Sequence, residues 1–196
     1  CIGDWMREWY LERPAAVMYG AASFQSYPLP QNKHAVFVGR LSHDTGVLEY
    51  VKAIQKLKGK MRLDIFGEGE LQDQLEKMIA KTPYIQYKGT TQNVEQTLVS
   101  HRFAFVSRYL GIIEAQQVGR LVFAHTDTHI KTSYLSTFPT AIQMIRFHDA
   151  ESLVSELEYV LAHPSYEQHL IQHAQTWAKQ QTWDRIATIY EELWQQ

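Results

Sequence analysis

The stretch AVFVGRLSHDTGVLEYVKAIQKLKGKMRLDIFG, residues 35–67, decides the fold of this chain, because its pattern predicts a strand, a helix and a second strand. Residues 35–40 form an apolar, β-branched run whose apolar part ends at a glycine, which is typical of a buried strand. Residues 62–67 repeat this pattern. Between them, apolar side chains recur at the spacing of one helix face: Val47, Tyr50, Val51, Ile54 and Leu57. Two strands joined by one helix are typical of a parallel unit.

The same alternation continues to about residue 147. Further strands are predicted at 85–89, 103–107, 121–126 and near 141–147, with helices in the intervals around 71–79, 93–100 and 112–118. We therefore predict an α/β fold, a Rossmann-like doubly wound parallel sheet of about six strands with helices on both faces. Ligands of such sheets bind beyond the carboxyl ends of the strands, so the strand-to-helix turns are the candidate site.

The C-terminal third of the chain is predicted to be helical. Asp149 can cap one helix, Pro164 marks the start of the next, and Thr182 can cap the last. Three tryptophans at helical spacing are predicted to pack in the core or against another domain: Trp177, Trp183 and Trp194.

We divide the chain into two parts at residue 34. Residues 1–34 are predicted to hold a helix, a lone strand AAVMYG at 15–20 and a proline-containing linker from the interdomain region at 21–34. Residues 35–196 are predicted to form the Rossmann-like domain with its C-terminal helices. The first residue is not methionine, which indicates a piece of a longer chain.

Composition narrows the class of protein. Nineteen basic against 21 acidic side chains give a net charge of −2, which argues against a protein that coats nucleic acid. The single cysteine, Cys1, gives no internal disulfide and no cysteine-rich metal site. The chain shows no apolar run of roughly 20 residues and no signal peptide. We expect a cytoplasmic protein.

Two glycine-containing turns follow the first two predicted strands. In the first, Gly39 lets the backbone approach a phosphate and Arg40 can bind a diphosphate, although an ordinary turn with a solvated arginine has the same spacing. The second turn, around Gly67, superficially resembles a dinucleotide fingerprint. It fails that pattern because Gln72 stands at the third glycine position and two glutamates would face the pyrophosphate.

A third turn, residues 107–115, contains a glutamate within an apolar run. Glu114 would be costly to bury without a partner, and a carboxylate at this place can accept both hydroxyls of a ribose. The backbone amides near Gly111 lie at the start of the predicted helix and can face an anion. These features favour a ligand-binding role for this turn.

The segment His125-Thr126-Asp127-Thr128-His129 raises a metal-site alternative, because in an extended segment its three polar ligands would share one face. No second cluster completes a coordination shell, so we predict no metal site. The sequence also lacks a nucleophile elbow, and no cofactor is implied.

Six segments carry a resemblance to a known family. They are VFVGRL (36–41), DIFGEGEL (64–71), YKGTTQNVEQTL (87–98), SRYLGIIEAQQVGRLVFA (107–124), IKTSYLSTFP (130–139) and TWDRIATIYEELW (182–194). In this order they resemble the C-terminal, donor-binding domain of a GT-B fold glycosyltransferase of family 4, the group 1 transferases. The resemblance runs from about residue 15 to the end of the chain and implies the second half of a GT-B fold.

The resemblance also implies a function. The chain would be the nucleotide-sugar-binding domain of a retaining, hexosyltransferase-type enzyme, which moves a sugar from a UDP-, GDP- or ADP-sugar to an acceptor hydroxyl in polysaccharide or glycoprotein synthesis. It would need a missing N-terminal acceptor domain, which could contact a membrane, and would be inactive alone. Donor contacts would come from eight residues: Gly39, Arg40, Gly67, Tyr109, Leu110, Gly111, Ile112 and Glu114. Within this set, Glu114 would hold the ribose and Arg40 the diphosphate.

Three positions depart from the family pattern. Thr45 stands at the place of a phosphate-binding lysine, Val106 at the place of a first glutamate, and Arg120 follows Gly119 where a proline is usual. The departures favour an alternative function, a non-catalytic GT-B module that acts as a partner or scaffold subunit. An epimerase-like GT-B chemistry is a third alternative that fits the closing segments less well.

Overall fold

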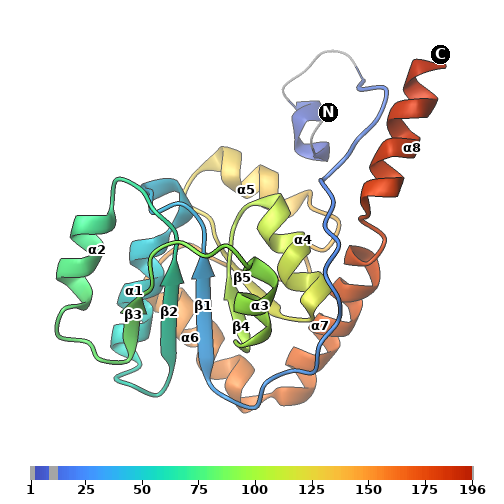
Figure 1. Ribbon diagram of the computed structural model, residues 1–196. Helices are drawn as coiled ribbons and strands as arrows, with labels where there is room; N and C mark the ends of the chain where they lie inside the picture. The colour runs from blue at the N-terminus through green and yellow to red at the C-terminus, as the bar shows by residue number, and fades with distance from the viewer. Residues whose placement is uncertain (1–2, 9–12, 196) are drawn as a thin grey trace.

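The computed structural model describes residues 3–8 and 13–195, and its centre is one six-stranded sheet (Figure 1). All neighbouring strands pair in parallel, in the order β3-β2-β1-β4-β5-β6. The strands are β1 (His34–Val38), β2 (Arg62–Phe66), β3 (Ile85–Tyr87), β4 (Phe103–Phe105), β5 (Leu121–His125) and β6 (Ile145–Phe147). The predicted doubly wound parallel sheet is therefore confirmed, and its order reverses at β1.

Helices cover both faces of the sheet and extend beyond it at the C-terminal end (Figure 1). They are α1 (Val47–Lys56), α2 (Gln72–Ile79), α3 (Val94–Val99), α4 (Tyr109–Val118), α5 (His129–Ser136), α6 (Ala150–Ala162), α7 (Pro164–Ala178) and α8 (Trp183–Trp194), with short 3-10 helices η1 (Asp4–Glu8) and η2 (His43–Thr45). The predicted caps are present: Asp149 accepts a hydrogen bond from the Ser152 amide at 2.8 Å, and Thr182 accepts one from the Arg185 amide at 3.3 Å.

Alternate residues of each strand supply two separate cores, as the two-residue period of a strand requires. On one face, Phe37 and Phe105 pack with side chains of α1, α2 and α6. On the other face, Val36 and Ala104 pack with side chains of α3, α4 and α5. Burial on both faces explains why the central strands β1, β4 and β5 are apolar almost throughout.

Three local features differ from the sequence-based expectation. Helix α4 begins at Tyr109 and not near 112, and α5 was not predicted at all. The expected strand at 15–20 is wrong, because these residues contain only an isolated bridge at Met18, where the Gly3 amide donates to the Met18 carbonyl at 2.7 Å. Part of the helix expected within residues 1–20 lies outside the described residues.

The last helix, α8, carries an apolar face that the described part of the chain leaves uncovered. Trp183 is 61% exposed and Trp194 is 82% exposed, whereas Trp177 of α7 is partly buried against the core. In Figure 1, α8 rises away from the sheet. None of the described helices combines the length and the hydrophobicity that a bilayer crossing requires.

Candidate functional site

The candidate site lies where the strand order reverses, at the carboxyl ends of β1 and β4. At this point the chain leaves neighbouring strands in opposite directions, which opens a crevice between the two following turns. The turn after β1 contains Gly39 and Arg40, and the turn after β4 contains Ser107 and Arg108. The predicted first and third turns are thus adjacent in space.

The turn after β1 is held in shape by its own side chains. The Thr45 hydroxyl is bonded to the carbonyl oxygens of Arg40, at 2.9 Å, and Ser42, at 2.7 Å. The turn after β2 packs directly on it: the Leu41 amide donates to the Glu68 carbonyl at 2.9 Å, and the Leu71 amide donates back to Leu41 at 3.0 Å. The glycine-rich second turn is therefore a support for the first.

Three hollows follow one another along this edge of the sheet. The first, of about 230 Å³, lies beyond β2 and β3 and is lined by Gly67, Thr90 and Thr91 among others. The second, also of about 230 Å³, contains Leu110, Gly111 and Glu114 of α4. The first two share Val38, Gly39 and Arg40 as lining residues.

The third hollow, of about 300 Å³, shares Ser107 and Arg108 with the second and extends toward α5. Trp5, Lys131 and Tyr134 are part of its wall. The Trp5 indole meets the Tyr134 ring edge-on, with 6.0 Å between the ring centroids. A continuous series of hollows with aromatic and charged walls is suited to a long, partly polar ligand.

Glu114 is the acidic group of the second hollow. Burial raises the pKa of this carboxyl from 4.5 to about 7. Among the residues that the structure describes, none donates a hydrogen bond to it. A half-buried carboxylate without a donor is destabilising by itself and is well placed to accept hydrogen bonds from a ligand.

The pKa of Glu114 predicts a pH dependence of stability. Because the folded state holds this proton more tightly than the unfolded state, the stabilisation is present below about pH 4.5 and is lost as the pH rises through about 7. We expect Glu114→Gln to be more stable than the wild type at pH 8 by about 2 kcal/mol, and similar to it at pH 4.5. Urea unfolding of both proteins at the two pH values measures this difference, and an equal difference at both would contradict it.

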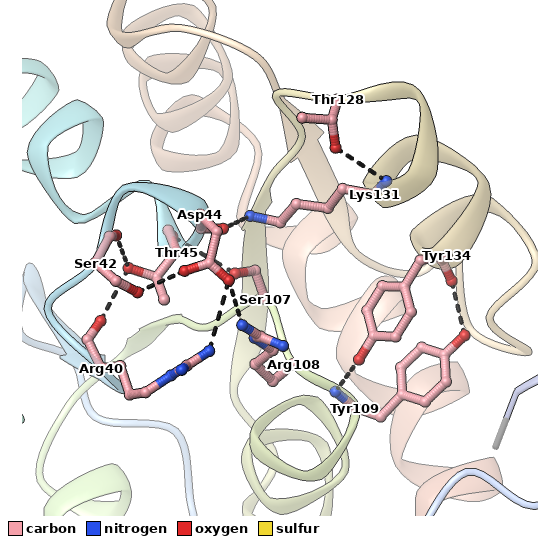
Figure 2. A network of polar contacts seen from close by, with 10 residues as sticks. All are labelled: Arg40, Ser42, Asp44, Thr45, Ser107, Arg108, Tyr109, Thr128, Lys131 and Tyr134. Carbon is pink, nitrogen blue, oxygen red and sulfur yellow. Dashed lines mark hydrogen bonds and ion pairs between the residues drawn. The ribbon is translucent and has the colours of Figure 1, made fainter.

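Figure 2 shows a network of polar contacts among residues that line the second and third hollows or lie beside them. The carboxylate of Asp44 is at its centre, bonded to the Arg108 guanidinium and lying 3.7 Å from that of Arg40. The Lys131 ammonium donates to the backbone carbonyl of Asp44, and the Ser42 hydroxyl donates to its carboxylate. These contacts lower the pKa of Asp44, the Ser42 hydrogen bond most and the cations after it.

Two expected site residues lie in the core instead. Tyr109 is 4% exposed and Ile112 is fully buried, and neither lines any of the three hollows. Both side chains belong to the core that α4 shares with α3 and α5, where Tyr109 packs against Phe138. Tyr109 stacks on Tyr134 at 3.9 Å between centroids, and its backbone amide donates to the Tyr134 hydroxyl at 2.6 Å. Both residues therefore lie outside the hollows, and a donor contact by either of them stays a prediction.

The other six expected residues line the first two hollows: Gly39, Arg40, Gly67, Leu110, Gly111 and Glu114. Sequence reasoning missed the role of Asp44, Arg108 and Lys131, because their proximity depends on three different turns meeting. Arg108 and Lys131 do lie inside two of the segments quoted for the family resemblance, which was the available signal.

The metal-site alternative has no support in the described part of the chain, where no group of three or more possible ligands is close enough to hold an ion. His125 ends β5 and is 4% exposed, whereas His129 begins α5 and is exposed. The segment is therefore a turn into a helix and not the extended strand that would align its ligands.

The sheet order defines a Rossmann-like domain, with the candidate ligand site in the hollows along its carboxyl edge. The chain belongs to the family described as Glycosyl transferases group 1, whose sequence model matches residues 32–163, more than half of the chain. The family expected from the sequence is therefore confirmed. No curated relative is similar enough in sequence to match.

Solved structures share this fold. TarM of S. aureus, in complex with UDP and other ligands, has a TM-score of 0.70 at 15% identity over 96% of this chain and 41% of its own. HepE of Anabaena, in complex with UDP-glucose, has a TM-score of 0.71 at 15% identity over 85% of this chain and 50% of its own. This chain is thus similar to half or less of these GT-B glycosyltransferases.

A third structure is similar over most of both chains. It is the C-terminal domain of LpcC, a glycosyl transferase group 1 family protein of Francisella tularensis, with a TM-score of 0.61 at 14% identity. The likeness covers 76% of this chain and 85% of that domain. The fold is therefore that of the C-terminal half of a GT-B structure.

Proposed function

We propose that this chain is the nucleotide-sugar-binding domain of a retaining glycosyltransferase that moves a sugar from a nucleotide diphosphate to an acceptor hydroxyl. The observation that carries the proposal is the series of three hollows at the switch point, with Glu114 and Arg40 in the middle one. Family membership supports it, and so do the UDP and UDP-glucose complexes of structures with this fold.

The hollows suggest how a donor would lie. The base would fill the hollow with Thr90 and Thr91, and the ribose hydroxyls would donate to Glu114 in the next. The diphosphate would then lie beside Arg40 and the first turn of α4, where the Leu110 and Gly111 amides have no partner within the helix. The sugar would enter the third hollow, beside Trp5 and Tyr134.

The proposed reaction needs charge stabilisation more than a nucleophile. As the bond from the sugar to the diphosphate breaks, negative charge grows on the leaving group, and arginine side chains and a helix N-terminus stabilise such charge. Arg40, Arg108 and the start of α4 supply these groups here. We propose hexosyltransferase-type chemistry in polysaccharide or glycoprotein synthesis and a cytoplasmic location for the domain.

A second domain is part of the proposal. The uncovered apolar face of α8, with Trp183, Tyr190 and Trp194 exposed, is suited to packing against a domain that supplies the acceptor site. This chain covers 50% of HepE and 41% of TarM, so both of these solved structures extend well beyond the part that it matches. Alone, the described domain would bind donor but transfer no sugar.

A non-catalytic partner role is the second candidate, and specific contacts favour it. Thr45 uses its hydroxyl to bind carbonyl oxygens of its own turn, and Val106 is buried. Neither residue offers a charged group to a donor. A folded domain that binds none of the three nucleotides in the presence of its N-terminal half would support this role.

The direct test is calorimetric titration with UDP, GDP and ADP. We expect one nucleotide to bind and Glu114→Ala to weaken it at least tenfold, about 1.4 kcal/mol, because the ribose loses its hydrogen-bond acceptor. Circular dichroism of the variant should match the wild type.

The matched control is Glu95→Ala, which removes a partly exposed carboxylate from α3. Glu95 accepts a hydrogen bond from the Gln25 amide and lines none of the three hollows. Binding that survives Glu114→Ala as well as it survives Glu95→Ala would show that the ribose site is assigned to the wrong residue.

A further inference from the structure

We propose that the Asp44 carboxylate occupies the place of the donor's diphosphate, and that the diphosphate binds by displacing it from a clasp formed by Arg40, Arg108 and Lys131. This inference rests on the proposed function, because it takes the anion to be part of a nucleotide sugar. The clasp itself is a property of the described residues.

The three cations come from three different turns and meet at one residue (Figure 2). Arg40 follows β1, Arg108 precedes α4, and Lys131 lies in the first turn of α5. Both guanidinium groups contact the same carboxylate oxygen of Asp44, and the ammonium contacts its backbone carbonyl. Asp44 lines the third hollow, and its partner Arg108 lines both the second and the third.

The clasp carries an excess of positive charge, which favours the binding of an anion. Three positive side chains surround one carboxylate, and a diphosphate carries more negative charge and more acceptor oxygens than one carboxylate can supply. Three other acidic groups line the hollows: Glu68 in the first, Glu114 in the second and Asp127 in the third. The proposed placement of Glu114 against the ribose leaves the clasp free for phosphate.

The present contacts of Asp44 are of a kind that a ligand can replace. Its side chain is 50% exposed, and those of Arg108 and Arg40 are 55% and 68% exposed. Ion pairs between exposed side chains are weak because water competes for both partners. Asp44 lies in the short helix η2, and the Ser42 hydroxyl donates to the carboxylate oxygen that the arginines do not contact, so the side chain keeps one partner when the arginines leave it.

The opposite role for Asp44 gives the opposite result. If its carboxylate orients the two arginines for the ligand, then removing its charge would weaken binding. If it competes with the ligand, then removing its charge would strengthen binding. Asp44→Asn keeps the size of the side chain and separates the two roles by the sign of the change.

The experiment titrates UDP and inorganic pyrophosphate into the full 196-residue chain at constant salt. We expect Asp44→Asn to bind both probes about tenfold more tightly than the wild type, and Lys131→Gln to bind both at least fivefold more weakly. The matched controls are Asp73→Asn and Lys77→Gln, which make the same charge changes at exposed positions of α2. These controls should stay within twofold of the wild type.

Equal or weaker binding of pyrophosphate by Asp44→Asn would overturn the proposal, as would no binding by any variant. UDP binding that needs Glu114 but ignores Asp44 and Lys131 would overturn it while leaving the proposed function intact. Tighter pyrophosphate binding by Asp44→Asn, with UDP no better than pyrophosphate, would support the clasp and count against the nucleotide-sugar function.

Discussion

Arg120→Met is expected to lower the free energy of unfolding by about 3–5 kcal/mol, because it leaves a set of buried carbonyl groups without a donor. Arg120 is 1% exposed, and burial lowers its pKa to about 10. Its guanidinium donates to six backbone carbonyls, at 3.0–3.4 Å: Tyr27, Pro28, Leu98, Val99, Val118 and Gly119.

The position of these carbonyls explains why a positively charged side chain is stabilised here. Four of them belong to the C-terminal ends of α3 and α4, where the negative ends of two helix dipoles meet. The remaining two belong to the linker at residues 27–28. The Arg120 guanidinium therefore joins the linker to the sheet domain. Arg120 stands at the position where the family pattern has a proline.

Urea unfolding followed by tryptophan fluorescence measures the effect. Arg146→Met, which removes an exposed arginine from β6, is the matched control and should change stability by less than about 0.5 kcal/mol. Arg120→Lys should recover part of the loss, because an ammonium keeps the charge but not the fork of donors. A loss for Arg120→Met no larger than that of the control would contradict this account.

Most of the fold could be predicted because the spacing of apolar residues along the sequence indicates which faces of the strands and helices are buried. The strand runs are apolar on both faces, and the first helix shows a clear stripe, so both were assigned with nearly correct bounds. Helix α5 was missed because its sequence has no such stripe: Ile130 is exposed, whereas Ser133 and Leu135 are buried. The helix packs against η1 and the turn after β1, and such contacts leave no period in the sequence.

The residues of the candidate site could be predicted only where a single strand-to-helix turn identifies them. Gly39, Arg40 and Glu114 each follow a recognisable strand, and each lines a hollow. The network at Asp44 joins side chains that are 64 and 87 residues apart in sequence. No local pattern encodes such a distance. Arg120 departs from the family pattern, and two of its six carbonyl partners belong to a linker that no local pattern places beside it.

Gly67→Ala is expected to destabilise the protein by about 3 kcal/mol or more and to abolish nucleotide binding. Gly67 has a φ of +142°, an angle that residues with a side chain rarely adopt. A Cβ built there would lie 1.8 Å from the Gly39 carbonyl oxygen. Because the Cβ would collide with a backbone atom, no side chain can move aside to make room. The turns after β1 and β2 would have to separate. Gly39 and Arg40 would then move, and with them the walls of two hollows.

Gly89→Ala is the control that separates strain from collision. Gly89 also has a positive φ, +72°, but a Cβ there would meet nothing within 4 Å. It should therefore cost only the left-handed backbone strain, about 1–2 kcal/mol. Thermal unfolding and titration of both variants with the nucleotide that the wild type binds measure the two effects. If Gly67→Ala lost no more stability than Gly89→Ala and still bound nucleotide, the close approach of the two turns would not be what holds Arg40 in the site.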